Sequence, residues 1–452
     1  MESVKIKSLL NELIIVIHSI IDEGRKKRIL EPSYIKYKKS WATDFEYGNK
    51  GFQNFKRLSR EFSKPIWDEA AQYVFKKIKK LKIYDDTFKA LSEYNGLTER
   101  KTNIYLPFII IHVAKNILEG KVKNFTDTNK YIDSFLRDIN GENQEFRILL
   151  QLKALILQPK SINLGNGVKL RRPELKDFTE EIPIYSITNK TKHMDTTAIL
   201  DIKIHSDSKN SRKTIINTIE RIVAIFRLFR VGAIEYIGYY INSSSLLEGS
   251  GKIETTSKLW GKQKYLITRE DVKLLKIFWK NVIEIELPYS VYSTSKKEPN
   301  ALSISYNRYL DSLESGVAEK RISSAVMGLE ALYLSPGEQQ DMSYRLSMRV
   351  SKLLSLTGYD PIEVRTHIKD AYNIRSTYVH GSLVSKKSSR KYENKYSNLI
   401  DFSEIIMDYL RASIVVLLKM PNKAFITQKI DDSLLDSKKE EEVTKFLFSP
   451  YS

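Results

Sequence analysis

Apolar positions along the first 160 residues recur with a helical period. The N-terminal stretch spaces its leucines and isoleucines as the apolar face of an amphipathic helix, from Leu9 to Ile21. The same period continues at intervals as far as about Pro159. It predicts three further helices: Trp67–Ile83, Tyr105–Leu118 and Thr128–Ile139.

A basic segment lies between the N-terminal helix and the helix predicted at Trp67–Ile83. Gly24–Ser40 carries Tyr34 and Tyr37 among its lysines and arginines. Cations interleaved with aromatic rings suit RNA, through phosphate pairing and base stacking. The simpler interpretation is a solvated loop, and both interpretations remain open at this point.

Alternation of apolar and polar residues replaces the helical period from about residue 161. Ile162 and Leu164, then Val168 and Leu170, flank the dipeptide Asn166-Gly167. Asn-Gly favours a two-residue hairpin turn, because both turn residues need a positive φ. Strands and helices then alternate. The strands are predicted at Ala198–Ile204 and Ala233–Ile241, and the helices at Lys213–Phe229 and Arg269–Ile283. Thr268 and Asp271 form a pattern close to a capping box at the start of the last helix.

The helical period returns after the polar segment Ser293–Asn300, which is the best candidate for a domain boundary. Pro361 suits the first turn of a helix, and Pro421 closes the last one. The spacing predicts five helices: Ser303–Ser315, Glu319–Leu334, Asp341–Leu356, Pro361–Val379 and Asn398–Met420.

These patterns together predict an α+β, mainly helical protein. We expect a helical N-terminal region at residues 1–160 and an α+β domain at 161–299. A five-helix bundle at 300–421 follows, and residues 422–452 are expected to form a loose tail, although Phe446, Leu447 and Phe448 could dock onto the rest.

Charge and composition restrict the kinds of partner and site that the protein can have. The formal net charge is +19 and the pI is near 9.5, which favours a polyanion such as nucleic acid. A general lysine-rich composition is the alternative explanation. The absence of cysteine excludes disulfides, cysteine-bound zinc and thiol nucleophiles. We expect a cytoplasmic protein with no membrane contact, because no stretch reaches roughly 18 uninterrupted apolar residues and the N-terminal apolar run is broken by polar residues.

The fourth helix of the bundle carries the most informative residues. On a helical wheel, Arg375 falls in the middle of the apolar side that includes Val364 and Ile368. A guanidinium keeps its charge, so it needs a carboxylate, a phosphate or water in such a place. His380 follows at the last turn, and Gly381 is suited to end the helix. The helix dipole favours a protonated imidazole at that end.

This stretch resembles a known family. Arg375-Ser-Thr-Tyr-Val-His380 fits the R-x4-H signature of HEPN domains, and the surrounding run resembles the ApeA-like HEPN subgroup. The resemblance covers the chain from roughly residue 300 to 420. It is carried by SSAVMGLEALYL (Ser323–Leu334), YRLSMRVSKLLSL (Tyr344–Leu356) and AYNIRSTYVHG (Ala371–Gly381).

The resemblance implies a metal-independent endoribonuclease that acts in antiviral defence or abortive infection. HEPN domains generally form a homodimer, in which two R-x4-H motifs build one composite cleft. The implied substrate is tRNA or another structured RNA. The remaining two thirds of the chain would then recruit substrate or sense an activating trigger, of phage or other origin.

The chemistry of RNA agrees with this pair of residues. The 2′-hydroxyl of RNA can attack the adjacent phosphorus, so an enzyme needs a proton-exchanging group and a cation. His380 suits the first task, and Arg375 suits the second as a phosphate clamp. On one straight helix they would lie about 140° apart with roughly 7.5 Å of rise, so either a turn after the helix or a second copy must bring them together. The structural alternative is a buried arginine that holds a helix end beside a capping histidine.

Other residues are carried over as support. Many HEPN motifs have Asn, Asp or His directly after the arginine, where this chain has Ser376, and Asn373 precedes the arginine by two residues. Glu330 is either the carboxylate that neutralises Arg375 or a partner of Arg345 or Arg349. We expect Arg349 itself to be structural.

The basic loop after the motif, Ser385–Lys395, is either an RNA-capturing segment or an ordinary solvated loop. Its expected RNA-binding residues are Lys386, Lys387, Arg390 and Lys391. We interpret His112 as a core histidine, and His18, His193, His205 and His367 as incidental. No cofactor is expected, because the chain has no P-loop, dinucleotide-binding or HExxH motif and no spacing typical of metal ligands.

Two other functions remain open from the sequence. One is a catalytically silent module that binds RNA or dimerises through the bundle. The other is a nucleic-acid-dependent regulator in which the basic N-terminal segment does the binding.

Overall fold

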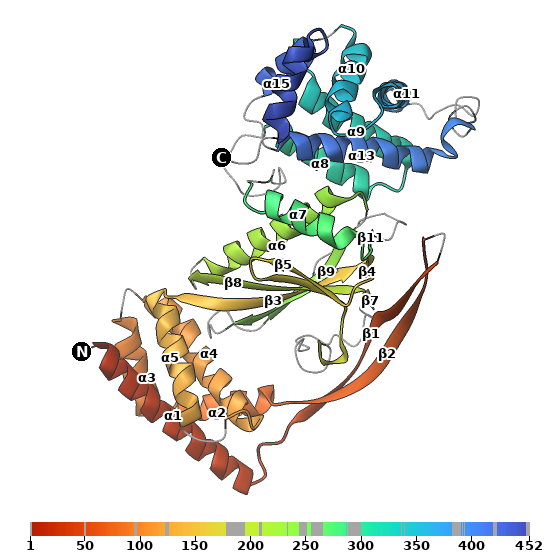
Figure 1. Ribbon diagram of the computed structural model, residues 1–452. Helices are drawn as coiled ribbons and strands as arrows, with labels where there is room; N and C mark the ends of the chain where they lie inside the picture. Colours follow the sequence, from red (N-terminus) through yellow and green to blue (C-terminus); the bar gives the residue numbers. More distant parts are fainter. Residues whose placement is uncertain are drawn as a thin grey trace. The chain divides into compact units, whose positions relative to one another are not determined.

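The protein has an α+β, mainly helical fold, as predicted (Figure 1). The computed structural model describes residues 2–48, 51–94, 97–122, 126–177, 195–207, 210–232, 234–243, 251–254, 265–285, 287, 300–335, 337–338, 340–381, 390, 392, 394–418 and 423–448. Its contacts divide the chain into two compact units. Unit 1 comprises Met1–Lys153, Leu157–Ile219 and Tyr236–Thr256, and unit 2 comprises Ala154–Ile156, Glu220–Glu235 and Ser257–Ser452. These units do not coincide with the predicted boundaries at 160 and 299.

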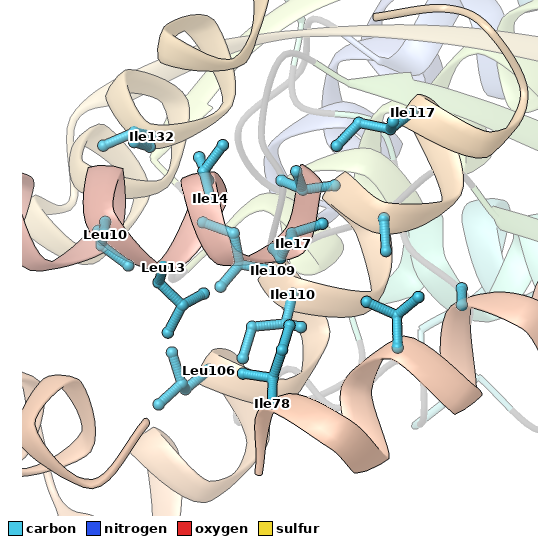
Figure 2. Packing of buried hydrophobic residues seen from close by; sticks show 14 of the residues in the cluster. Leu10, Leu13, Ile14, Ile17, Ile78, Leu106, Ile109, Ile110, Ile117 and Ile132 are labelled. Carbon is cyan, nitrogen blue, oxygen red and sulfur yellow. The ribbon is translucent and has the colours of Figure 1, made fainter. Parts of the chain in front are cut away.

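Five helices of unit 1 share one hydrophobic core. Figure 2 shows Leu10, Ile14 and Ile17 of the first helix facing Ile109 and Ile110 of the fourth. These side chains are at most 2% exposed, as the apolar spacing predicted. The helices are α1 (Glu2–Lys26), α2 (Asp68–Ile78), α3 (Lys82–Ser92), α4 (Glu99–Leu118) and α5 (Thr126–Asn140).

The single helix predicted at Trp67–Ile83 is wrong, because this stretch forms the whole of α2 and the start of α3. Leu81 interrupts it with an extended backbone, at φ −101° and ψ 145°. The apolar positions Val74, Ile78, Tyr84 and Leu91 are all buried, so both helices keep the amphipathic pattern. A local break of this kind leaves no mark on apolar spacing, because burial continues on both sides of it.

The segment between α1 and α2 forms two long strands, so the predicted solvated loop at Gly24–Ser40 is wrong from Ser33 onward. β1 (Ser33–Gly48) and β2 (Gly51–Ile66) pair antiparallel, with Ser33 opposite Ile66 and Gly48 opposite Gly51. Figure 1 shows them as a long twisted ribbon. The short strand β7 (Asp195–Thr196) adds to β1 in parallel, which gives the order β2-β1-β7 among the described strands.

A six-stranded sheet makes up the other part of unit 1. Its order is β10-β9-β3-β8-β6-β5, and β3 pairs with β8 antiparallel from Asn143↔Asp207 to Leu152↔Ala198. The sheet therefore begins at Asn143, inside the region predicted to be helical. The strands are β3 (Asn143–Lys153), β5 (Ser161–Gly165), β6 (Val168–Arg171), β8 (Ala198–Asp207), β9 (Glu235–Ser243) and β10 (Gly251–Glu254).

The predicted Asn-Gly hairpin is confirmed. Asn166 and Gly167 join β5 to β6 with φ angles of 49° and 73°, the pair of positive values that a tight hairpin turn requires. A Cβ on Gly167 would lie 2.5 Å from the Lys203 carbonyl oxygen of β8. The glycine is therefore needed both for its backbone angle and for the close approach of β8.

The turn after β6 is held by buried ion pairs. Arg171 donates two hydrogen bonds to the fully buried Asp177, at 2.7 and 2.5 Å, and Asp177 also accepts from the Glu174 backbone N–H at 2.6 Å. Arg172 donates to the Leu157 carbonyl at 2.9 Å. The Arg-Arg-Pro-Glu run at residues 171–174 therefore has a structural role in unit 1.

Unit 2 contains a two-stranded sheet of β4 (Leu155–Leu157) and β11 (Tyr265–Ile267). It also contains the second half of α6 (Ser211–Phe229) and the whole of α7 (Asp271–Val282). The predicted reciprocal bonds at the start of α7 are present. The Thr268 N–H donates to Asp271 at 2.8 Å, and the Asp271 N–H donates to Thr268 Oγ1 at 3.3 Å.

The five predicted helices of the bundle are all present, and the fourth has the predicted bounds. α8 begins with a capping box between Asn300 and Ser303, directly after the candidate boundary, whose residues 293–299 lie outside the described residues. The helices are α8 (Ala301–Glu314), α9 (Ala318–Tyr333), α10 (Met342–Ser355), α11 (Pro361–Val379) and α13 (Leu399–Leu417).

The loose tail predicted for residues 422–452 is wrong, and the alternative that its last apolar residues dock is confirmed for Leu447. Residues 423–448 form α14 (Lys423–Ser433) and α15 (Ser437–Phe448), whose residues Ile426, Ile430, Val443 and Leu447 are buried. Lys352 of α10 forms an ion pair of 2.9 Å with Glu440 of α15. These apolar positions are few and spaced among many charges, which is why the tail resembled a solvated segment.

Candidate active site

The fourth bundle helix, α11, has a defined start and end. The Asp360 side chain caps its start by accepting from the Glu363 N–H at 2.7 Å, and Pro361 occupies the first turn. At its end the His380 N–H donates to the Ser376 carbonyl at 3.2 Å, and the Gly381 N–H donates to Tyr378 at 3.1 Å. Gly381 has a φ of +78°, the left-handed angle typical of a residue that ends a helix. His380 therefore sits at the carboxyl end of a complete helix.

Arg375 lies at the edge of the buried face of α11, which corrects the prediction that it lies in the middle. Val364, Ile368, Ala371 and Ile374 are buried, whereas the Arg375 side chain is 24% exposed. The helix is rotated so that Ile374 points inward. A partly exposed guanidinium can meet a ligand from solvent, which a fully buried one cannot.

Glu330 of α9 is the carboxylate that faces Arg375. Arg375 Nη2 donates to Glu330 Oε2 at 3.2 Å, and the Glu330 side chain is 14% exposed. Burial raises the pKa of Glu330, while the Arg375 charge lowers it. Glu330 Oε1 and Arg375 Nε are buried without a hydrogen-bond partner among the described residues. Of the three arginines left open by the sequence, Arg375 is therefore the one that Glu330 contacts.

Arg349 shows what a purely structural arginine looks like in the same bundle. Its side chain is 5% exposed, and each of its five N–H groups has an acceptor between 2.6 and 2.8 Å away. The acceptors are Glu338, Asp431 and the Tyr333 carbonyl. Arg375, by contrast, makes one hydrogen bond within the described residues, plus a contact of 5.8 Å with the Tyr372 ring. Donors of Arg375 remain available to a phosphate.

The other predicted site residues on α11 do not converge on Arg375. His380 is exposed, and its imidazole makes no hydrogen bond within the described residues. Asn373 is exposed, while Ser376 is half-buried and contributes its backbone carbonyl to the helix end. One subunit therefore brings together Arg375 and Glu330 and leaves the imidazole open to solvent.

The basic loop is only partly within the described residues. Lys386, Lys387 and Lys391 lie outside them, and Arg390 is exposed. Lys395, the last residue of this loop, and the next residue, Tyr396, both contact Asp370 of α11, at 2.7 and 2.6 Å. The described end of the loop therefore contacts α11 at Asp370.

His367 was predicted to be incidental, but it is buried at a junction of α11 with α13. Its Nδ1 lies 2.9 Å from the Tyr409 hydroxyl, and its ring packs against Tyr396 and Phe402 at 5.1 and 5.9 Å. Burial lowers its pKa; Glu363 and Asp370 raise it, and Lys395 lowers it. Its position one turn before Ala371, on the same side of the helix, was the available signal.

Gly328 explains part of the Gly-Leu-Glu-Ala-Leu run in α9. A Cβ there would lie 2.8 Å from Leu410 of α13 and 3.2 Å from Arg308 of α8. Its carbonyl accepts from Ser305 at 3.0 Å. This close approach of three helices positions α9, and with it Glu330, two residues further on.

Comparisons with known proteins add nothing to these contacts: no family model, no curated protein and no solved structure matches the chain. Within the described residues, no group of three or more histidine, aspartate or glutamate side chains is placed to hold a metal ion. In that same part of the chain, no helix is both long enough and apolar enough to cross a membrane.

Proposed function

We propose that the protein is an endoribonuclease of the HEPN type that cuts RNA with the 2′-hydroxyl as nucleophile and without a metal ion. The observation that carries this proposal is the state of Arg375. It is held in place by one carboxylate, is partly exposed, and lies on a helix whose exposed end is His380. The resemblance of Ser323–Leu334, Tyr344–Leu356 and Ala371–Gly381 to HEPN domains supports the same function.

Each group has one task in the proposed reaction. The imidazole of His380 takes the proton of the 2′-hydroxyl, the 2′-oxygen forms a bond to phosphorus, and the bond from phosphorus to the 5′-oxygen breaks. The leaving 5′-oxygen takes up a proton, which the protonated imidazole returns directly or through water. Arg375 pairs with the phosphate oxygens, where negative charge builds up. The products are a 2′,3′-cyclic phosphate and a 5′-hydroxyl, so DNA is not cut.

The proposed active form is a homodimer. Arg375 and His380 are five residues apart, which on a regular helix places them about 140° apart around the axis. Gly381 ends the helix directly after His380. Within the described residues, the imidazole of His380 makes no contact with Arg375 of the same subunit. A second copy supplies the missing half of the cleft in our proposal. Asn373 and Ser376 are supporting residues of this cleft.

The biological setting follows from the resemblance. We propose a cytoplasmic enzyme of antiviral defence or abortive infection whose substrate is tRNA or another structured RNA. Residues 1–299 would sense a trigger, of phage or other origin, or recruit the substrate. Lys386, Lys387, Arg390 and Lys391 would hold the RNA beside the cleft.

Cleavage of tRNA in the presence of EDTA tests the chemistry. The wild type is expected to leave 2′,3′-cyclic phosphate ends, whereas Arg375→Ala and His380→Ala are not. Arg365→Ala, on the same helix, is the matched control and should cleave as the wild type does. Binding of RNA without cleavage by all four proteins would instead identify the silent RNA-binding module.

Expression in cells covers the case of an enzyme that needs a trigger. The wild type is expected to be toxic when expressed, and His380→Ala is expected to be tolerated at an equal protein level. Equal toxicity of the two proteins would contradict a role of His380 in the activity. RNA binding that survives removal of residues 301–452 would favour the regulator whose N-terminal segment binds nucleic acid.

A further inference from the structure

The β1–β2 ribbon is a second basic surface, and the proposed chemistry does not use it. Residues 33–66 contain eight basic and three acidic residues. Each strand has 16 residues, which at about 3.3 Å per residue corresponds to roughly 50 Å. β2 is an edge strand in the described sheet order β2-β1-β7. Figure 1 shows the ribbon following α1 and leading into α2.

Both faces of the ribbon carry cations. Tyr34, Lys36 and Lys38 alternate along β1 and therefore share one face. Lys56, Arg60 and Lys64 alternate along β2 on the opposite face, because Arg60 and Lys64 pair with residues 39 and 35.

Several described side chains of the ribbon are open to solvent. Tyr34 is 68% exposed, and Lys36, Lys56 and Arg60 are exposed. No ion pair joins Lys36, Lys56 or Arg60 to another described residue. These groups therefore have charge and hydrogen-bond donors available to a partner.

The base of the ribbon continues this track of positive charge. Lys64 is half-buried near Lys115 and Lys121 of unit 1. The two neighbouring carboxylates are already paired, Asp68 with Lys115 and Glu119 with Lys121, each at 2.6 Å. Burial lowers the pKa of Lys64; Glu119 and Asp68 raise it, and Lys121 and Lys115 lower it. An anion placed here would offset the concentration of cations.

Protection of an edge strand is the simpler reason for charged residues on a ribbon. Charges of either sign prevent pairing between sheet edges. The described charged side chains of this ribbon are Lys36, Lys38, Lys56, Arg57, Arg60, Glu61 and Lys64. Glu61 is the one carboxylate among them, and it stands directly opposite Lys38. Such a bias toward one sign is expected for binding a polyanion and is not needed for edge protection.

We propose that the β1–β2 ribbon is an RNA-binding arm. Its lysines and arginines pair with phosphates of a structured RNA, and Tyr34 stacks on an unpaired base. The choice of RNA over other polyanions rests on the proposed function. The arm captures substrate and takes no part in the bond-breaking step.

Binding of fluorescent tRNA to the full-length protein tests the arm. The triple variant Lys36→Ala, Lys56→Ala, Arg60→Ala is expected to bind at least about tenfold more weakly, and the slope of log affinity against log salt should fall by about 2 to 3. The matched control is Lys80→Ala, Lys82→Ala, Lys89→Ala, three exposed lysines of unit 1 with the same change of charge. The control should keep the wild-type affinity and slope. Equal weakening of both triple variants, or of neither, overturns the proposal.

Cross-linking of the wild-type protein tests the arm independently, in case the triple variant fails to fold. Photo-reactive tRNA is expected to cross-link to peptides of residues 33–38 and 56–66. Cross-links confined to other segments overturn the arm, as does tighter binding of DNA hairpins of the same length than of tRNA.

The two proposals fail in different ways. Binding and cleavage of tRNA are therefore measured separately, on the wild type and on the triple variant of the ribbon. Ribbon-dependent binding without any cleavage would remove the nuclease and keep the arm. Cleavage with ribbon-independent binding would remove the arm and keep the nuclease.

Discussion

Glu330 of α9 and Arg375 of α11 are joined by one hydrogen bond of 3.2 Å, and each has another buried polar atom that meets no partner among the described residues. The pair is incomplete compared with Arg349, all of whose N–H groups are taken. A pair with one hydrogen bond orients the guanidinium without engaging all of its N–H groups. That combination is what a phosphate-binding arginine needs, and it makes Glu330 a positioning residue in our proposal.

Glu330→Gln tests this positioning role. A hydrogen bond to a charged group contributes about 1.5 to 3 kcal/mol. If half or more of that is lost from the transition state, cleavage should slow by about threefold or more, with a smaller change in KM. The measurement is tRNA cleavage at several substrate concentrations, with Glu404→Gln as the control, a carboxylate of the same bundle with an 18% exposed side chain. A KM effect alone, or equal loss in the control, would contradict the assignment.

Arg349→Met should be far more damaging to stability than to chemistry. Removing one partner of a buried charge network costs about 3 to 5 kcal/mol, and the partial exposure of Asp431 places the expected loss near the lower value. Arg345→Met is the matched control, because Arg345 is on the same helix, contacts the same Glu338 at 2.8 Å and is 45% exposed. Its expected cost is within about 1 kcal/mol. Thermal melting of both variants checks this prediction, and equal losses would argue against it.

Acid should weaken the same network. The hydrogen bond from Arg349 is the main reason that the pKa of Glu338 is lowered to about 2, with the Ser335 N–H and Arg345 adding to it against the effect of burial. A carboxylate with a lowered folded pKa contributes stability above its ordinary value near 4.5, and this contribution is lost as the pH falls toward 2. Melting temperature measured from pH 6 to pH 3 should therefore fall more steeply in the wild type than in Arg349→Met. Parallel curves would show that Glu338 does not carry this dependence.

The bundle could be predicted from sequence because its signals are local. Each of its helices has an apolar stripe of regular period, and α11 also has Asp360-Pro361 at its start and Gly381 at its end. The Asn166-Gly167 turn is local in the same sense. These features depend on neighbours within a few residues, so one sequence is enough to find them.

The β1–β2 ribbon could not be predicted because alternation needs one buried face. Here Tyr34 and Lys36 are exposed on one face, and Lys56 and Arg60 on the other. Trp41 is buried, but exposed cations lie on both faces, so neither face gives a continuous apolar alternation. The pairing also joins residues up to 33 positions apart, as in Ser33↔Ile66. Strand pairing of this kind is decided by the partner strand more than by local preference.

The difference between Arg349 and Arg375 was also beyond the sequence. Both fall on the apolar side of a helix by spacing. Arg349 is completed by Glu338 from the loop after α9 and by Asp431 from α14, 82 residues away in the chain. Which arginine keeps free donors depends on these distant acceptors. A helical wheel contains no information about them, and it placed Arg375 nearer the middle of the buried face than the structure does.

His112 gives unit 1 a different dependence on pH. Its ring stacks on Phe108 at 5.9 Å and meets Tyr131 at 5.5 Å. The pKa of His112 is lowered to about 4, mainly by burial and also by Lys121 and Lys115, against the opposing effect of Glu119. Between pH 6.5 and 4 the unfolded chain binds a proton at this site that the folded chain does not, so stability falls as the pH falls. His112→Phe should remove about 3 kcal/mol of the stability that is lost between pH 6.5 and pH 4, as measured by denaturant unfolding at both pH values. The control is His205→Gln, at an exposed histidine.

Gly328→Val tests how closely α9 must pack to place Glu330. A valine side chain would meet Leu410 and the Cβ of Arg308, where even a Cβ lies within 3.2 Å. Overpacking of this kind costs about 1 to 3 kcal/mol, and any shift of α9 would move Glu330 away from Arg375. The variant should therefore melt at a lower temperature and cleave more slowly at temperatures where it is still folded. Gly337→Val is the control, because a Cβ at Gly337 meets no atom within 4 Å. A Gly328→Val protein with wild-type melting and cleavage would show that the bundle absorbs the added volume without moving the pair.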